Sequence, residues 1–444
     1  MACRWILSWL AAVLFFATPA GNALAATDVA EKVQAHLYAG QSADAASVAR
    51  SRLAEAPDDD QARFALGAVQ FLQAVERLGQ SLHRYGLRSA QNQSEIGLLA
   101  LPILRIPVPE NPNPDELTYE AFRGVLDAFV IDLQTAEATL GKIKDQPIDL
   151  PLNIGLIRLD LNGDGKGSDD EALWLIFREV AHAGWLDEEA AEKLLSDFDG
   201  SDAPWLQAYC HLLMAIAEFP LAHDWQEAFE ISFQGLFHMP SSPYRKIGQT
   251  NAEDIASMAK NFRGTELTAE VFERFVRAKE RSRYVGIADL FAFIHLNHWP
   301  VVEPERMANV LGHLEAMVRL GQENWKRILA ETDNRVEWIP NPSQTGVLPR
   351  MPVTQQQIDG WKNFLDEFEA ILQGKKLIPH WRFNEGINMR RFFLEPKTFD
   401  IVLLIQGSAA LPYLEKGELS TRRTWLQITR LFGGNFFRYV IWFN

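Results

Sequence analysis

The sequence predicts a mainly α protein: a multi-helical body that carries one small β-hairpin. Apolar residues recur at helical spacing along many segments of about ten residues or more, and several segments start at a capping residue. Stretches that alternate apolar and polar residues, as strands do, are few and short. With 47% apolar residues, the chain is able to bury a large core.

Residues 1–25 have the pattern of a secretory signal peptide. Arg4 precedes an apolar run over residues 6–17, and an Ala-x-Ala triplet ends at Ala25. We expect cleavage after Ala25 or Ala26. The apolar run is too short to span a bilayer, and no later stretch is long enough. A periplasmic or secreted protein without a transmembrane segment in its mature chain is therefore expected.

The charge balance of the chain is acidic. The formal net charge is −15, and removal of Arg4 with the signal peptide makes the mature chain one unit more negative. Such a surface argues against nucleic acid and anionic lipid as partners. Cys3 would leave with the signal peptide, so Cys210 would remain as a single thiol, which we expect to be buried.

Residues 26–98 predict a helical hairpin and a third helix that starts at Asp60 and ends near Leu82. Gly40 is followed five residues later by Ala45, and Pro57 is followed nine and ten residues later by Leu66 and Gly67. This spacing resembles about one and a half tetratricopeptide repeats (TPR). Arg63 stands where such a repeat usually has a large aromatic residue. The resemblance implies a TPR-like pair of helices that either packs within the fold or offers a groove to a protein partner.

The proline-rich stretch 99–117 predicts an extended, stiff connector and is the best candidate for a domain boundary. Residues 118–444 then form an α-helical domain, whose first helix is capped by Thr118. Asp202, followed by a proline in the first turn, predicts the cap of another helix. Further helices are expected at 187–196, 203–218, 268–296 and 303–332, and after Asp224.

Two more elements are predicted toward the C-terminus. Thr354 and Gln357 form a capping box at the start of an amphipathic helix, which Gly374 ends. Residues 380–392 alternate around a glycine-containing turn and predict the β-hairpin.

The twelve residues 160–171 read Asp-Leu-Asn-Gly-Asp-Gly-Lys-Gly-Ser-Asp-Asp-Glu and are the most informative stretch of the chain. Ca²⁺ takes about six to eight oxygen ligands, and Gly165 falls at the sixth position, where a calcium loop turns sharply. The match resembles an EF-hand loop. It implies a Ca²⁺ ion bound at positions 1, 3, 5, 7, 9 and 12, which are Asp160, Asn162, Asp164, Lys166, Ser168 and Glu171.

The resemblance also assigns roles to these residues. Lys166 would offer its backbone carbonyl, Ser168 would bind through a water, and Glu171 would close the site with both carboxylate oxygens. Gly167 replaces the apolar residue that normally pairs with a second loop, and residues 151–159 alternate like a strand or extended arm. We therefore expect a lone loop followed by one helix. The alternative is a helix-capping turn that binds nothing.

Two further groups of residues invite a functional interpretation. The segment 197–202 is acidic but has no closing carboxylate, so it predicts a cap, although it could lie beside the calcium loop and lend it an oxygen. Trp205, His211, Asp224 and Trp299 would support an enzyme if they converged on one cavity.

Motifs of nucleotide binding, of serine hydrolases and of cysteine-rich zinc sites do not occur in the sequence. The function predicted is that of an exported calcium-binding helical protein, an interaction or scaffold protein with a structural Ca²⁺ ion. The alternative is a hydrolase-like periplasmic enzyme that acts on cell-wall or carbohydrate material, with calcium as a structural ion and catalytic residues unassigned. A calcium sensor that changes shape is a third hypothesis, which a lone loop disfavours.

Overall fold

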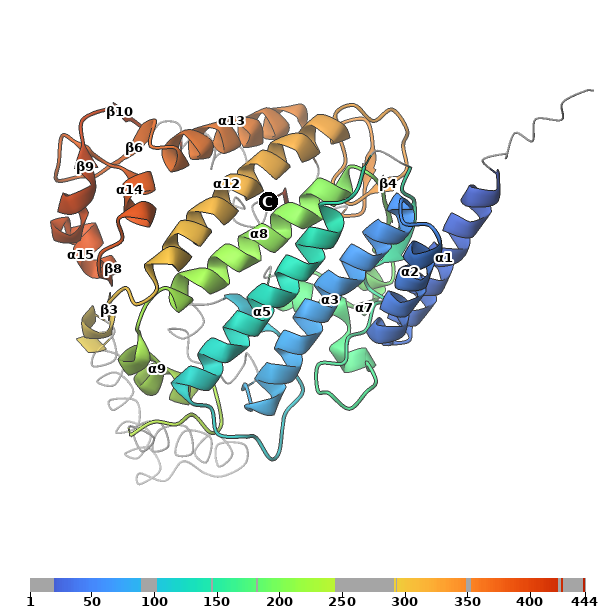
Figure 1. The fold of residues 1–444 in the computed structure, drawn as a ribbon, viewed down its shortest axis with the longest axis horizontal. Helices are drawn as coiled ribbons and strands as arrows, with labels where there is room; N and C mark the ends of the chain where they lie inside the picture. Colours follow the sequence, from blue (N-terminus) through green and yellow to red (C-terminus); the bar gives the residue numbers. More distant parts are fainter. Residues whose placement is uncertain are drawn as a thin grey trace, which may run out of the picture.

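The computed structural model describes residues 20–88, 102–144, 147–180, 183–243, 291–292, 294–348, 353–421, 425 and 442–443. Most of these residues are helical, and the strands are short and few, so the prediction of a mainly α protein is confirmed. Figure 1 shows long helices that cross the molecule side by side.

The α-helices are α1 (Ala20–Tyr38), α2 (Ser42–Glu55), α3 (Asp60–Arg84), α5 (Tyr119–Leu140), α6 (Leu173–Val180), α7 (Glu188–Ala191), α8 (Asp202–Leu221), α9 (Gln226–Ser232), α12 (Pro304–Ile328), α13 (Gln355–Leu372), α14 (Met389–Leu394) and α15 (Ile401–Gln406). Short 3₁₀ turns are η2 (Pro102–Arg105), η3 (Asp169–Glu171), η4 (Phe233–Gly235) and η5 (Ser408–Tyr413). The strands are β1 (Leu150–Asn153), β2 (Leu195–Phe198), β3 (His298–Trp299), β4 (Val336–Glu337), β5 (Thr345–Gly346), β6 (Lys376–Pro379), β7 (Gly386–Ile387), β8 (Phe399–Asp400), β9 (Leu414–Glu415) and β10 (Glu418–Leu419).

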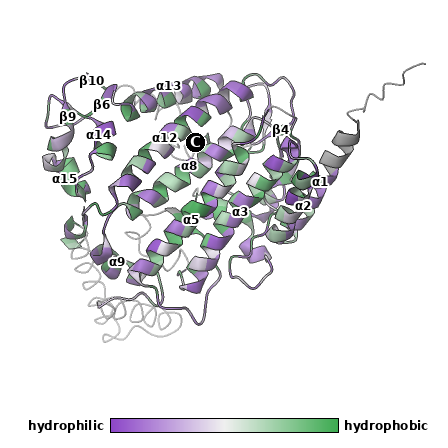
Figure 2. Cartoon of the chain, in the orientation of Figure 1, coloured by the Kyte–Doolittle hydropathy of each residue, from purple (hydrophilic) through white to green (hydrophobic). Residues whose placement is uncertain are grey.

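Seven helices form a row in which each packs against the next in chain order: α1, α2, α3, α5, α8, α12 and α13 (Figure 1). Apolar and polar residues are mixed along these helices, as Figure 2 shows, and α8, in the middle of the row, has no solvent-exposed residue. Their buried faces belong to one continuous hydrophobic core. The N-terminal hairpin and the helices that follow residue 118 therefore share this core.

Close approach of two helices in the row depends on a glycine. A Cβ atom added to Gly67 of α3 would lie 2.5 Å from Cγ of Leu140 in α5, well inside van der Waals contact. Gly67 was noted in the sequence because of its repeat-like spacing. Here the small residue lets α3 pack tightly against α5, because only a hydrogen atom separates the α3 backbone from the leucine side chain.

A second layer covers the row near α3, α5 and α8. It contains the antiparallel pair β1–β2, in which Leu150 faces Phe198 and Asn153 faces Leu195, together with η2 and α6. The extended arm expected over 151–159 is therefore a strand in its first half. The arm leads directly into residues 160–171 and then into α6, so this layer carries the predicted calcium loop.

The capping predictions place several helix ends correctly. The Thr118 side chain accepts the Ala121 N–H at the start of α5. Thr354 and Gln357 form the predicted box at the start of α13, and Gly374 follows that helix with a φ of +70°. These ends are set by hydrogen bonds within one turn, which is why the sequence alone locates them.

Two local predictions are wrong. The helix expected over 187–196 is only the single turn α7, because residues 195–198 leave it to pair with β1. The cap of α8 is Ser201, and Asp202 is the first helical residue; its Oδ2 accepts the Asp199 N–H instead. In both cases a partner outside the predicted element decides the outcome: β1 pairs with the backbone of residues 195–198, and the Asp199 N–H donates to the Asp202 carboxylate.

The β-hairpin exists but is displaced toward the N-terminus. β6 pairs with β7, so the first strand precedes His380 and residues 380–385 form the connection. Asn388 then caps α14, which contains residues that were expected in the second strand. β9 and β10 extend the pair to a four-stranded sheet.

The described part of the proline-rich stretch lies against the protein. Ile103, Leu104, Ile106 and Val108 are buried in the core, so the segment runs across the second layer.

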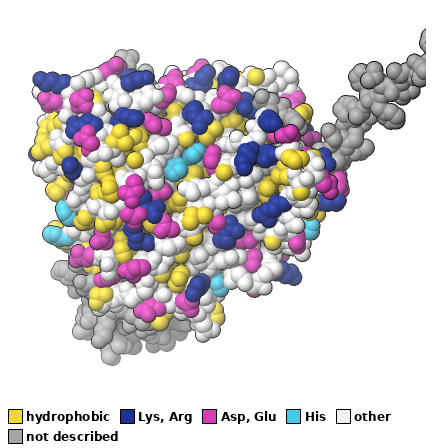
Figure 3. All heavy atoms as spheres, in the orientation of Figure 1, with side chains coloured by type: hydrophobic (Ala, Val, Ile, Leu, Met, Phe, Trp, Pro, Cys, Tyr) yellow, Lys and Arg dark blue, Asp and Glu magenta, His cyan; other side chains and the backbone are white. Residues whose placement is uncertain are grey.

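The helix predicted at 268–296 lies outside the described residues except for its last few positions. Basic and acidic side chains are interspersed over the face shown in Figure 3. Among the described helices, none is long and apolar enough to cross a membrane.

We predict opposite effects for two glycine-to-alanine substitutions in the row. Gly67→Ala should destabilise the protein by about 1–3 kcal/mol, because the new methyl group displaces Leu140. The control is Gly124→Ala on the exposed side of α5, where nothing lies within 4 Å of an added Cβ. That change should stabilise by about 0.5–1 kcal/mol through helix propensity. Urea unfolding measures both; equal effects would contradict the packing described.

Candidate metal centre

The residues 160–171 form a compact loop between the β1 arm and α6. Both ends of the loop are tied together, because the Leu159 N–H donates to the Glu171 carbonyl. Gly163 and Gly165 turn the chain with φ of +76° and +89°, a conformation that other residues adopt at a cost. The sharp turn expected at the sixth position of a calcium loop is thus present at Gly165.

Asp160, at the first position, organises the turn. Its Oδ1 accepts the N–H groups of Gly163 and Asp164, at 2.8 and 3.1 Å, and its Oδ2 accepts that of Gly165 at 2.9 Å. The carboxylate is nearly buried, with 9% of the residue exposed. Three backbone donors therefore fix its orientation toward the inside of the loop.

The third and fifth positions lie at the exposed rim of the loop. Asn162 Oδ1 accepts the Asp164 N–H at 2.8 Å, and Asp164 Oδ1 accepts the Lys166 N–H at 2.9 Å. Asp164 and Lys166 are solvent-exposed. These side chains are held by one or two bonds each, so they retain free lone pairs for a ligand.

Glu171, at the twelfth position, is fully buried, with 0% of the residue exposed. Its Oε1 accepts the N–H groups of Leu161 and Asn162, at 2.8 and 2.9 Å. Its Oε2 accepts the Ser168 N–H at 3.0 Å and the Ser168 hydroxyl at 2.7 Å. One carboxylate therefore joins the beginning of the loop to its end, and Ser168 forms a capping box with it.

Helix α3 supplies the floor of the loop, which the sequence did not reveal. Glu76 Oε2 accepts the Asp160 N–H at 3.1 Å, and Gln80 donates to the Asp160 carbonyl at 2.8 Å. Leu161 packs over Gly79, where a Cβ would lie 2.5 Å from its Cδ2. The signal available was the spacing of Glu76, Gly79 and Gln80 along one helical face, but no local rule connects that face to a loop 80 residues away.

The α1–α2 turn lies against the other side of the loop. Gly40 and Gly167 pack so closely that a Cβ on Gly40 would lie 2.6 Å from the Gly167 Cα atom, and the Gly167 N–H points to the Gly40 carbonyl at 3.5 Å. Arg158 reaches the same turn, donating from its backbone to Leu37. Glycine at the eighth position is thus explained, because the α1–α2 turn lies where a second loop would otherwise pair.

The oxygen atoms of the loop suit a hard divalent cation, but in the described conformation they are not grouped so as to hold one. Within the described residues, no three His, Cys, Asp or Glu side chains are grouped so as to hold a metal ion. The four hydrogen bonds to Glu171 occupy its lone pairs, so bidentate coordination would require it to exchange backbone donors for the ion. Asp160, Asn162 and Asp164 need no such exchange.

The acidic segment 197–202 forms a separate group. Asp199 Oδ1 accepts from the Ser201 N–H and hydroxyl, and no hydrogen bond joins the described residues 197–202 to the loop 160–171. The nearby Glu337 of β4 is buried, and burial together with the charges of Asp199 and Glu331 raises its pKa from 4.5 to about 8. This group therefore lends no oxygen to the loop, and Glu337 is largely protonated at neutral pH.

Trp205, His211, Asp224 and Trp299 do not converge on one cavity. Trp205 donates to the Trp442 carbonyl, and His211 lies 2.9 Å from His313, nitrogen to nitrogen. Asp224 and Trp299 line a different, open groove near β3. Burial lowers the pKa of His211 to about 4, so it stays neutral. The arrangement that would have supported the enzyme hypothesis is not present.

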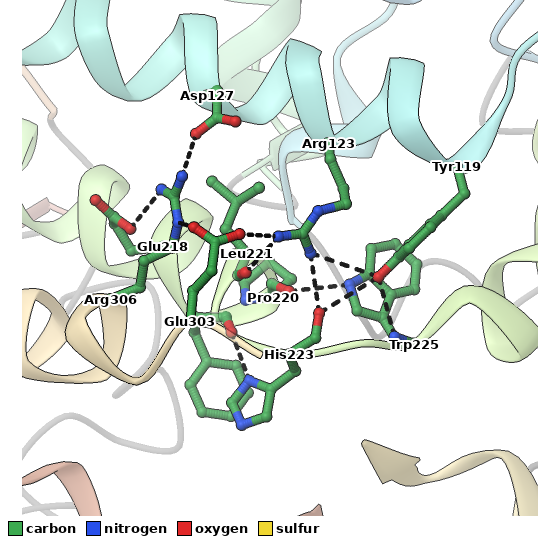
Figure 4. Close-up of polar contacts among 11 residues, drawn as sticks. Tyr119, Arg123, Asp127, Glu218, Pro220, Leu221, His223, Trp225, Glu303 and Arg306 are labelled. Atoms are coloured by element: carbon green, nitrogen blue, oxygen red, sulfur yellow. Dashed lines mark hydrogen bonds and ion pairs between the residues drawn. The ribbon is translucent and has the colours of Figure 1, made fainter. Parts of the chain in front are cut away.

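Charged side chains meet instead between α5, α8 and α12, as Figure 4 shows. Arg306 of α12 contacts Asp127 at 2.7 Å and the buried Glu218 at 2.8 Å, and it also pairs with Glu303. Arg123 joins Glu303 to the carbonyls of residues 221 and 223. Each charge has a partner of opposite sign, and these ions hold three helices in register.

The thiol of Cys210 on α8 is buried, as expected, and burial raises its pKa. A thiol that does not ionise is a poor nucleophile and a poor metal ligand.

Comparison with known proteins yields no match: no family model fits the chain, and no curated protein or solved structure is similar to it. The loop geometry is therefore the basis for any functional conclusion.

We predict that Glu171→Gln destabilises the protein even when all divalent ions are chelated. The amide has one acceptor oxygen in place of two, so at least one of the four buried donors around it loses its partner. The expected loss is about 1–3 kcal/mol, measured by urea unfolding in chelator.

Asp170→Asn is the matched control, since Asp170 is exposed, is next to Glu171 and occupies no ligand position. Its unfolding free energy should stay within about 0.5 kcal/mol of the wild type. Equal losses in the two variants would show that Glu171 does not organise the loop.

We also predict that Glu337 makes stability depend on pH. Its folded-state pKa is raised, so the folded protein binds the proton more tightly and stability declines as pH rises from about 4.5 to about 8. Glu337→Gln should remove at least about 2 kcal/mol of this decline, since one pKa unit corresponds to about 1.4 kcal/mol. Thermal unfolding of the wild type and of Glu337→Gln at about pH 5 and about pH 8 measures how much of the pH dependence of stability the substitution removes. An unchanged slope would rule out Glu337 as its source.

Proposed function

We propose that the protein is an exported calcium-binding helical protein of the interaction or scaffold type, in which one Ca²⁺ ion at residues 160–171 has a structural role. The observation that carries the proposal is the loop itself: oxygen-bearing residues at every ligand position of a calcium loop, folded around a glycine turn. Asp160, Asn162, Asp164 and Glu171 supply side-chain oxygens, Lys166 its carbonyl, and Ser168 a water contact.

The charges around the loop favour a cation. Glu76, Asp160 and Glu171 are buried near one another, and no Lys or Arg among the described residues forms an ion pair with any of them. Burial raises the pKa of Glu76, and the neighbouring Asp160 charge adds to this. Carboxylates withdrawn from water without a counter-ion are costly, and a divalent cation would offset that cost.

A structural role follows from what the loop contacts. It packs on α3 through Leu161 and on the α1–α2 turn through Gly167, and α6 begins two residues after Glu171. An ion that stiffens the loop would therefore stabilise the attachment of the N-terminal helices. The helices α1 to α3, with their repeat-like spacing, are the part that we propose for contact with a protein partner.

Export is supported by the residues before Thr27, which have the charge, apolar run and small-residue triplet of a signal peptide. Outside the cytosol, calcium modules bind the ion weakly, with dissociation constants of about 10⁻⁴–10⁻³ M, and use it for rigidity. The mass of the protein recovered from the periplasm or medium tests this part: the expected value corresponds to cleavage after Ala25 or Ala26.

We predict that Ca²⁺ at about 1 mM raises the melting temperature of the wild type by a few degrees over a chelated sample. Asp164→Ala should abolish most of this rise, because alanine has no oxygen at the fifth ligand position, whereas an asparagine there could still bind the ion. Asp164 is exposed, so water can accept the Lys166 N–H in its place, and the unfolding free energy in chelator should change by no more than about 0.5 kcal/mol. Differential scanning calorimetry with and without chelator measures both quantities.

Asp170→Asn again serves as the control and should keep the full calcium response. Mg²⁺ at the same concentration should shift the melting temperature less, because a loop of this kind suits the larger ion. A wild-type melting curve that is identical in calcium and in chelator would refute the metal site, and the loop would then be a capping turn.

A further inference from the structure

A cavity of about 210 Å³ lies between the row of helices and the second layer. The helices α3, α5 and α8 form one side, and η2, the β1 arm and α6 form the other. Protein interiors seldom contain voids much larger than a water molecule. Empty apolar volume also reduces stability in proportion to its size. A cavity of this size is therefore better explained by an occupant than by imperfect packing.

The residues that the structure describes in the wall of the cavity are aliphatic and aromatic, and none of them is charged. Representative members are Phe64 and Val75 of α3, Phe129 of α5, Leu213 of α8, and Ile176 and Phe177 of α6. An engineered apolar cavity of about 150 Å³ stays dry and binds benzene. The present cavity is larger, so it has room for a hydrocarbon somewhat bigger than benzene.

Two donors among the described wall residues have no hydrogen-bond partner, the Trp338 indole N–H and the Tyr209 hydroxyl. The Trp338 nitrogen has almost no accessible surface, whereas Tyr209 of α8, packed between Phe71 and Trp205, lines the cavity. Its hydroxyl has no hydrogen-bond partner among the residues that the structure describes. The indole of Trp205, by contrast, already donates to the Trp442 carbonyl at 2.9 Å. Burial raises the pKa of Tyr209 to about 12, so the hydroxyl keeps its proton and can donate it.

Since none of the described lining residues is a cation, the charge of the ligand is restricted. A carboxylate or phosphate would have to give up its water and find no opposite charge in the wall, which is strongly unfavourable. An uncharged oxygen needs only one donor, and Tyr209 provides it. We propose that the cavity binds an uncharged aliphatic molecule of medium chain length that carries one oxygen, such as an alkyl ketone or ester, with its oxygen on the Tyr209 hydroxyl.

This site is separate from the proposed calcium loop, although α6 touches both. It needs no residue at a ligand position of the loop, so it can be correct whether or not the metal binds. Calorimetric titrations are therefore carried out both with about 1 mM Ca²⁺ and with chelator, and the comparison between ligands is made within each condition.

The first test compares 2-octanone with octanoate on the wild-type protein. The ketone should bind, and octanoate should bind at least about tenfold more weakly at pH 7, because its charge is not compensated. Tyr209→Phe should lower the affinity for the ketone about two- to tenfold, which is the equivalent of one hydrogen bond, and should leave the affinity for heptane unchanged. Absence of ketone binding, or equal binding of octanoate, overturns the proposal.

The second test fills the cavity. Ala68 of α3 lies in its wall, and Ala68→Ile should abolish ketone binding and raise the melting temperature. Ala138→Ile, on the exposed face of α5, is the control and should bind the ketone as the wild type does. Undiminished binding to a folded Ala68→Ile protein would place the ligand elsewhere and refute the site. If that variant does not fold, the Tyr209→Phe comparison decides the matter.

Discussion

The loop depends on one carboxylate that has been withdrawn from water. Glu171 makes no contact with solvent, and its two oxygens hold the N–H groups of residues 161, 162 and 168. Together with the backbone bond from Leu159 to the Glu171 carbonyl, these bonds close the loop, and without the carboxylate the buried donors would lose their partner. The direction of α6, the contact of Leu161 with α3 and the position of the α1–α2 turn all follow from that closure.

The second constraint is electrostatic and lies between α5, α8 and α12 (Figure 4). Arg306 connects Asp127 of α5, Glu218 of α8 and Glu303, which precedes α12, and Glu218 among them is almost fully buried. Buried ions of this kind are weak evidence of stability, but they strongly disfavour arrangements that leave a charge unpaired. They therefore fix the relative rotation of the three helices. The second layer packs against the helix row, and the apolar cavity lies between the layer and the row.

Local chemistry explains which predictions were correct. Thr118 and Thr354 cap their helices within one turn of chain, and Gly374 ends a helix by its own backbone conformation. Residues 195–198 show the opposite case, because they form a strand only in contact with residues 150–153, which are far away in sequence. Tyr209 is another such case: as a helical aromatic residue it predicts core packing, and only the assembled walls show a cavity beside it.

The sequence by itself determined the helical class and the main capping positions and predicted the candidate ligand positions in the loop 160–171, because each of these depends on short-range spacing. Only the tertiary structure decided that Glu76 and Gln80 support this loop, that Gly40 packs against Gly167, and that Trp205, His211 and Asp224 lie apart. The physical reason is that these contacts join residues distant in the chain, and their energy comes from burial and hydrogen bonds that exist only after the helices have packed.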